Sequence, residues 1–447
     1  MEDKLLCGAG KELITPPDEL IPNLFGLMRS SFDRVYDDLY VRVLALSCGK
    51  KKMLIISVDL DKGPCPVEFT ERLEEETGVP KENMLYFGIH AHAVPITGYR
   101  PFEKRNDITK KDKPVQEAVK AYEAYILEQM VKAALRAVNS QKPVRYGYGF
   151  GKSYINVKRT YIFEDRTKNG EEFVGEGWCN DDKVDRTTFV MRFEDMAGKP
   201  VAFLINYPMH NVSMFLNDAG SGKSAISSDI GGNVSKYMEA EFDGAVAVWS
   251  SGAAGDHNCI CSGNIEYPDP ATGKYRQEMI KDISVVSAMM RHMAATHFQD
   301  VLNINKQIQR LSESATLSVA TEYSHTPAAS GVMESPQYKI DKKDSYHIRL
   351  RLLRIGEVAL IGCNGELYNS LGQAIKAVSP MKNTVIITHD ASLVLDNPGY
   401  IYDDDTLLAI QKHGESGLPG WREFTGVPYT IRPSLEECTK RLFENQY

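Results

Sequence analysis

The chain has 447 residues, of which 43% are hydrophobic and 25% are charged, a balance typical of soluble globular proteins. Its formal net charge of −8 disfavours nucleic acids and anionic membrane surfaces as partners. No apolar stretch reaches the ~20 residues that a membrane span requires, and residues 1–4 lead directly into the first expected strand, without a secretory leader. We therefore expect a cytoplasmic protein with a small-molecule substrate, whose eight scattered cysteines are reduced thiols; a homo-oligomer remains open.

In chain order, short apolar blocks suit strands that are buried on both faces, and they lie at 41–46, 53–58, 84–87, 201–207 and 245–249. Segments with a 3.6-residue apolar period predict helices at 115–134, 229–242 and 282–298. Alternating apolar and polar residues predict antiparallel strands at 311–323 and 347–361. Residues 152–185 show no clear period, which predicts a long loop over the site.

This order of elements predicts an α/β fold with a mixed central sheet flanked by helices. The stretch 326–338, which contains Pro, Ala, Ser and Gly, is the best candidate for an internal boundary.

The segment Ile89-His90-Ala91-His92-Ala93-Val94-Pro95 follows the block at 84–87 directly. The C-terminal ends of strands are where α/β proteins build their sites. In an extended segment, residues two apart point to the same side, so His90 and His92 can address one centre. Imidazole is the commonest protein ligand for zinc and a proton shuttle near pH 7. A His-x-His pair by itself is equally typical of an exposed loop.

The segment resembles the Thr-His-Thr-His-Ser-Gly-Pro signature of the neutral/alkaline ceramidase family. Further segments resemble that family in the same order along nearly the whole chain. They are residues 8–17, 38–46, 54–60, 205–211, 252–258, 359–366 and 397–402. The resemblance implies that residues 1–447 form a single ceramidase-like catalytic domain. Because the chain ends soon after the last segment, we expect no C-terminal β-sandwich.

The resemblance also implies a zinc ion (Zn²⁺) held by His90, His210, Glu366 and Tyr400. These residue types are zinc ligands, and a catalytic zinc site keeps one position for water. Tyr402 lies two residues further on and is an alternative to Tyr400, because the acidic run at 403–405 departs from the family pattern. His210 and Glu366 could also have no metal-binding role, His210 as a histidine at a strand end and Glu366 as an exposed glutamate in a turn.

Other residues are expected to act on the substrate. His92 is the proposed proton shuttle or oxyanion donor, and Arg159 resembles a family arginine that lies near the substrate. Arg100 and His257 are candidate substrate contacts, with Arg100 and Arg159 able to grip a carboxylate. Asp59 is a candidate for orienting a metal-bound histidine, or equally a capping aspartate.

Asn258 stands where the ceramidases have a serine in a Gly-Asp-x-Ser-Pro loop, and Cys259 follows in place of proline. Asparagine cannot attack as a nucleophile, but it can donate a hydrogen bond to an oxyanion. Cys259 would need a lowered pKa to serve as the nucleophile. Metal-activated water is therefore the expected attacking group.

The sequence as a whole predicts a zinc-dependent hydrolase that cleaves an amide bond of a small polar substrate. One alternative is a zinc-dependent lyase or isomerase that acts on a sugar or a hydroxy acid. A second alternative is a homologue that binds a ligand without catalysis.

Overall fold

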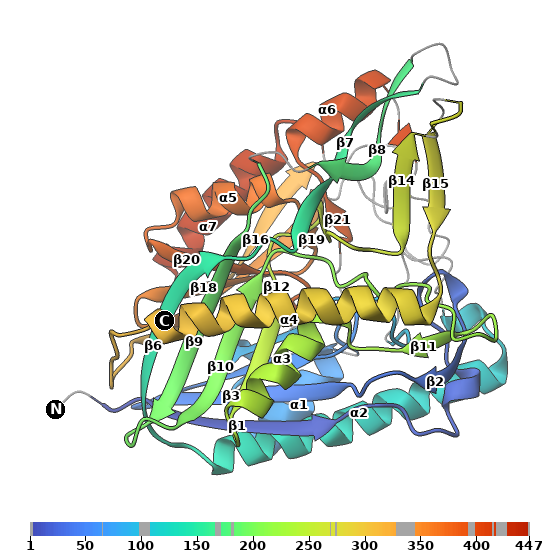
Figure 1. Ribbon diagram of the computed structural model, residues 1–447. Helices are drawn as coiled ribbons and strands as arrows, with labels where there is room; N and C mark the ends of the chain where they lie inside the picture. The colour runs from blue at the N-terminus through green and yellow to red at the C-terminus, as the bar shows by residue number, and fades with distance from the viewer. Residues whose placement is uncertain are drawn as a thin grey trace.

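The computed structural model describes residues 3–64, 66–97, 108–165, 171–179, 183–268, 270–272, 275–327, 345–391, 398–413, 415–416 and 427–445. In this part of the chain, two sheets pack face to face and helices cover both outer faces (Figure 1). The predicted α/β class is therefore correct.

The larger sheet has the strand order β12-β10-β9-β6-β1-β3-β4-β5. Its strands are β1 (Leu6–Leu13), β3 (Tyr40–Cys48), β4 (Lys51–Val58), β5 (Met84–Gly88), β6 (Lys142–Lys152), β9 (Thr187–Asp195), β10 (Pro200–Tyr207) and β12 (Val246–Ser251). The pairs β4–β5 and β10–β12 are parallel, and the other pairs are antiparallel. The sheet is therefore mixed, as the sequence predicts.

Side-chain alternation along β3 explains why this sheet is covered on both faces. Val41 and Val43 join a core shared with the helices, whereas Leu44 and Leu46 join a core shared with the second sheet. The helices on the first face are α1 (Pro66–Thr77), α2 (Lys113–Asn139), α3 (Asp229–Glu241) and α4 (Ile283–Gln307). Gly10 lets α2 approach β1 closely, because a Cβ at that position would lie 2.0 Å from the Ala133 carbonyl oxygen.

The second sheet has the order β16-β17-β18-β20. Its strands are β16 (Leu317–Pro327), β17 (Ser345–Ile355), β18 (Val358–Cys363) and β20 (Asn383–Ile387). Its outer core also contains residues of α5 (Asn369–Val378), α6 (Asp404–His413) and α7 (Ile431–Glu444). β16 and β17 pair along their whole length, so the stretch 326–338 begins in a strand of this sheet and runs into residues outside the described part.

Residues 152–185 do not form the predicted long loop, because 156–179 contain two paired strands, β7 (Asn156–Asp165) and β8 (Glu171–Cys179). A register shift between Lys158 and Thr160 interrupts the pairing, and such an irregularity breaks the regular alternation by which a strand is recognised in sequence. β13 (His257–Cys259) pairs with β7. This pairing places the family-like loop at 252–258 beside Arg159.

The remaining elements are short. The strands are β2 (Phe32–Val35), β11 (Ser224–Ile226), β14 (Asn264–Pro268), β15 (Tyr275–Met279), β19 (Glu366–Leu367), β21 (Tyr400–Ile401) and β22 (Glu415–Ser416). Single 3-10 turns lie at Ile21–Asn23, Leu27–Arg29, Lys81–Asn83 and Ile108–Lys110. Every helix in the described ranges is too short or too polar to cross a lipid bilayer.

Candidate metal centre

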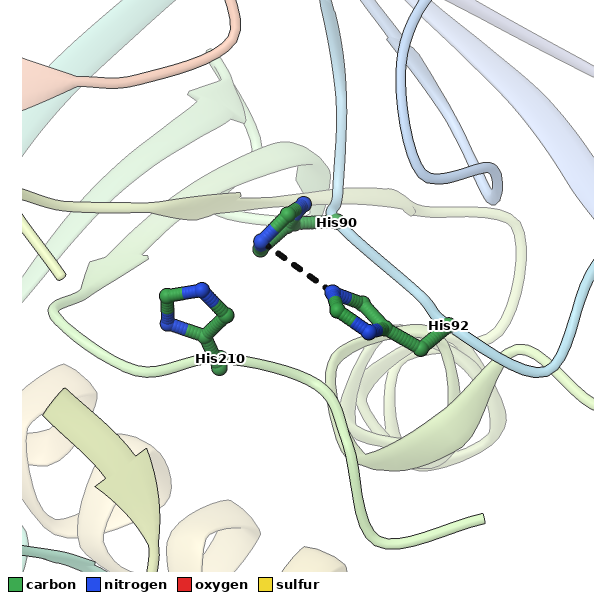
Figure 2. A group of neighbouring side chains, drawn as sticks. All are labelled: His90, His92 and His210. Atoms are coloured by element: carbon green, nitrogen blue, oxygen red, sulfur yellow. Dashed lines mark hydrogen bonds between the residues drawn. The ribbon is translucent and has the colours of Figure 1, made fainter. Parts of the chain in front are cut away.

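Three histidines meet where strands of the two sheets end. His90 follows β5, His210 follows β10 and His389 follows β20. Isolated bridges join the three segments, from Ala91 to Asn211 and from Phe87 to Asp390. Figure 2 shows that the rings of His90, His92 and His210 converge on one small region. The C-terminal edge of the strands therefore carries the site, as the sequence predicts.

The four ligands implied by the resemblance lie together. Glu366 Oε2 lies 3.4 Å from His90 Nε2 and 3.3 Å from His210 Nε2, and the Tyr400 hydroxyl lies 3.1 Å from His210 Nε2. Zinc bonds of about 2.0–2.2 Å in a tetrahedral shell place neighbouring ligand atoms about 3.3–3.5 Å apart. These three separations are close to the edges of such a shell, so the donor set fits a metal ion.

Tyr400, and not Tyr402, faces this group. β19 and β21 pair so that Glu366 lies opposite Tyr400, and the Tyr400 ring stacks on His210 with 6.1 Å between centroids. Tyr402 is buried against Tyr368, with 4.9 Å between ring centroids. The geometry therefore removes Tyr402 as the alternative ligand.

The hydrogen bonds of His210 put its hydrogen on Nδ1 and its lone pair on Nε2, where the Arg159 Nη2 donor also lies at 3.3 Å. Its Nδ1 lies 3.0 Å from the carbonyl oxygen of His257, which can only accept, so Nδ1 carries the hydrogen. Burial, with the nearby Arg159 guanidinium, lowers the pKa of His210 to about 3. His210 is thus a neutral imidazole, which is the form that binds metals.

His90 is held by a carboxylate that the sequence analysis did not select. Its Nδ1 lies 2.6 Å from Asp61 Oδ1. Burial alone would lower its pKa, but Glu366 and Asp61 outweigh that effect and raise the pKa of His90 to about 9. Asp59, one candidate for orienting this histidine, instead forms an ion pair with Arg42 at 2.8 Å and accepts from the Tyr40 amide at 2.9 Å. The alternative of a capping aspartate therefore holds for Asp59, and Asp61 is the carboxylate beside the histidine.

His92 lies as near to His90 as the predicted ligands lie to one another, with 3.2 Å between the two Nε2 atoms. Burial and the neighbouring His90 hold its pKa well below the usual range, which favours a neutral ring. Two histidine-containing groups have donor atoms within 4.8 Å of one another, namely His90-His92-His210 and His90-Glu366-His389. His90 belongs to both groups and is the common element of the centre.

Arg159 and Asn258 form one wall of the site. Arg159 donates to the Tyr400 hydroxyl at 2.9 Å and to Asn258 Oδ1 at 3.2 Å, and its Nη2 lies 3.3 Å from His210 Nε2. It also donates to the Gly255 carbonyl at 2.9 Å, and only 5% of the residue is exposed. With Oδ1 engaged, Asn258 keeps its amide N–H groups for another partner.

The two expected substrate contacts have different outcomes. His257 is fully buried, its Nδ1 lies 3.0 Å from Asp256 Oδ1, and its Nε2 accepts from the Asp185 amide at 3.1 Å. The prediction that His257 contacts substrate is therefore wrong, because both ring nitrogens are engaged inside the protein. Arg100 lies outside the described residues.

Three residues of the site were missed in the sequence, namely Asp61, Lys62 and His389. Lys62 Nζ lies 3.7 Å from Glu366 Oε1, on the oxygen that faces away from the histidines. His389 is buried and follows an apolar strand, the pattern by which His90 was selected. That pattern was a usable signal for His389, whereas no spacing rule identifies Asp61 or Lys62.

No family model and no curated protein matches the chain in sequence. Solved structures do match. The neutral ceramidase from Pseudomonas aeruginosa is 15% identical with a TM-score of 0.69, over 98% of this chain and 74% of that chain. A ceramidase complexed with C2 is 15% identical with a TM-score of 0.70, over 99% of this chain and 76% of that chain. The chain therefore has the fold of the neutral ceramidases, as its motifs suggested.

Proposed function

We propose that this protein is a zinc-dependent hydrolase that cleaves an amide bond of a small polar substrate. One observation carries the proposal. His90, His210, Glu366 and Tyr400 present donors at separations close to the edges of a tetrahedral zinc shell, beside Arg159 and Asn258. The ceramidase fold supports the choice of an amide as the bond that is cleaved.

When bound, zinc would polarise the substrate carbonyl and lower the pKa of water to about 7. The protein supplies the remaining chemistry. His92, half-buried beside His90, is placed to take up a proton from the attacking water and return it to the leaving amine. Arg159 and Asn258 are placed to hold the oxygen on which negative charge develops.

Nucleophilic attack by Asn258 or by Cys259 is disfavoured. Asn258 has no nucleophilic atom, and burial raises the pKa of the adjacent Cys259 thiol well above its usual value. Water is therefore the proposed nucleophile.

The charge around the centre supports a polar substrate. The Lys62 side chain, which lies beside Glu366, is 16% exposed, and the half-buried Asn258 adds hydrogen-bonding capacity. The acidic run after Tyr402 does not support this view, because Asp403 accepts from the Thr406 amide at the start of α6 and is buried. Two further charged segments of the sequence, 99–105 and 163–166, fall where side chains are not described.

The test is a substrate panel of N-acyl amino acids, N-acyl amino sugars and a short-chain ceramide, assayed with zinc-loaded protein in ¹⁸O-labelled water. We expect the polar amides to be cleaved in preference to the ceramide. The products should be a free amine and an acid that carries the label. Turnover of the ceramide with every polar amide untouched would contradict the substrate class. A zinc-loaded protein that cleaves no amide but eliminates water from, or isomerises, a sugar or hydroxy acid would contradict the reaction class.

The variant Asn258→Ala is expected to reduce turnover by about 10²–10³-fold, the usual loss when one oxyanion donor is removed. Zinc content should not change, because Asn258 contacts Arg159 and not the predicted ligands. Steady-state kinetics and metal analysis check both statements. A covalent intermediate on residue 258 or on Cys259, detected by intact mass, would contradict attack by water.

A further inference from the structure

His389 is a buried histidine with no role in the predicted ligand set. Its backbone φ is +63°, and that of His90 is +62°, so both residues adopt the left-handed conformation that non-glycine residues rarely use. Such conformations persist only where the surrounding structure enforces them, and they cluster at functional sites. Two such residues in contact indicate that the surrounding structure holds both rings in this arrangement.

The two rings are stacked. Their centroids are 3.9 Å apart and their planes differ by only 22°. The other histidines touch His90 edge-on, with interplanar angles of 83° for His92 and 63° for His210. His389 therefore covers a flat face of His90, while the predicted centre lies at its edge.

The segment that carries His389 is anchored on both sides. The Thr388 amide donates to the Ser251 carbonyl at 3.0 Å, and the Asp390 amide donates to the Cys363 carbonyl at 2.9 Å. The Ala391 amide donates to the Tyr86 carbonyl at 2.7 Å, which ties the segment to the strand that carries His90. The His389 ring is thus presented from a fixed backbone.

A buried ion pair adds to this anchor. Arg349 donates from Nη2 to the Asp390 carbonyl at 2.8 Å, and the same nitrogen lies 3.6 Å from Asp390 Oδ2. Both side chains are fully buried. The pair therefore fixes the backbone behind His389.

We propose that His389 is a positioning residue, whose ring holds His90 in the plane that aims Nε2 at the metal. His90 is tethered through Nδ1 to Asp61, and this contact alone does not fix the plane of the ring. A rigid ring stacked on its face blocks the tilt. His389 Nδ1 has no hydrogen-bond partner, so the face of the ring, and not that nitrogen, is in use.

The inference rests on the metal-binding part of the proposed function, so the test measures binding and not activity. Zinc affinity is determined by competition with a chromogenic chelator for the wild-type protein, His389→Ala and His389→Phe. The absorption spectrum of the cobalt-substituted proteins reports the ligand geometry. We expect about 10–100-fold weaker zinc binding and an altered cobalt spectrum for His389→Ala, and recovery to within about threefold for His389→Phe, which restores a flat ring.

His297→Ala is the matched control. His297 is also buried, packs against the Tyr207 ring at a tilt with 4.6 Å between centroids, and has an unpartnered Nδ1, but it lies outside both donor groups. The His297→Ala variant should lose thermal stability but keep the zinc affinity of the wild type. Circular dichroism shows whether each variant is folded. If His389→Ala is not folded, His389→Leu, which fills the volume without a flat ring, takes its place.

Three results would count against the proposal. Equal losses in His389→Phe and His389→Ala would show that a ring nitrogen matters and that His389 is a ligand. Unchanged affinity in the folded His389→Ala and His389→Leu variants would overturn the inference alone. A wild-type protein without zinc affinity would overturn the proposed function together with it.

Discussion

Replacing His90 with alanine is expected to lower zinc affinity by more than ~10²-fold, beyond the 10–100-fold that loss of an outer-shell partner costs. His90 is the residue shared by both groups of candidate donors, so neither group is complete without it. Its loss also leaves the buried carboxylates of Asp61 and Glu366 without the imidazole that lies between them. Metal analysis of the purified variant and a chelator-competition titration measure the loss.

The control for this variant is His292→Ala, which removes an exposed imidazole from α4 and should bind zinc as the wild type does. Circular dichroism establishes that the His90→Ala protein is folded. A folded His90→Ala protein that retains full zinc occupancy would contradict the metal centre, because every donor set available in the described residues depends on His90.

The sequence predicted those strands and helices that have a recognisable pattern of apolar residues within their own segment. β4, β5 and β10 are continuous apolar blocks, and a strand buried on both faces has that composition wherever it occurs. The hairpin of β7 and β8 was missed, because a register shift interrupts its alternation. The packing of two sheets against each other was not predictable, since the alternation in β3 shows that both faces are buried and not what covers them.

The candidate site divides in the same way. His90, His210 and Glu366 each follow an apolar strand, and their order along the chain matched a known pattern. Asp61 and Lys62 were missed, because their proximity to His90 and Glu366 depends on the path of the chain after β4. His257 was assigned a role from its place in a loop, but β13 turns its ring inward, to Asp256 and Asp185. Chain order suggested which residues are near the site, and only the packing showed which of them face it.

His92→Ala is expected to reduce turnover by about 10²–10⁴-fold, the contribution of a positioned acid–base group, with zinc affinity unchanged. Distance alone does not distinguish a proton shuttle from a metal ligand at this position. His92 Nε2 lies only 3.2 Å from His90 Nε2, a separation that two ligands of one ion would also show. Because Asp61 and Glu366 raise the pKa of His90, its Nε2 carries a hydrogen in the metal-free protein and donates it to the neutral His92 ring. A metal bound at His90 Nε2 would displace that hydrogen and leave His92 Nε2 free for proton transfer.

The comparison of His92→Ala with His90→Ala therefore decides between the two roles of His92. Turnover is measured on the best substrate of the panel, and zinc affinity is measured by the same chelator competition. If His92 transfers protons, only turnover falls in His92→Ala, whereas both quantities fall in His90→Ala. If zinc affinity falls equally in the two variants, His92 is a ligand together with His90 and His210. Proton transfer would then have to be assigned to another group.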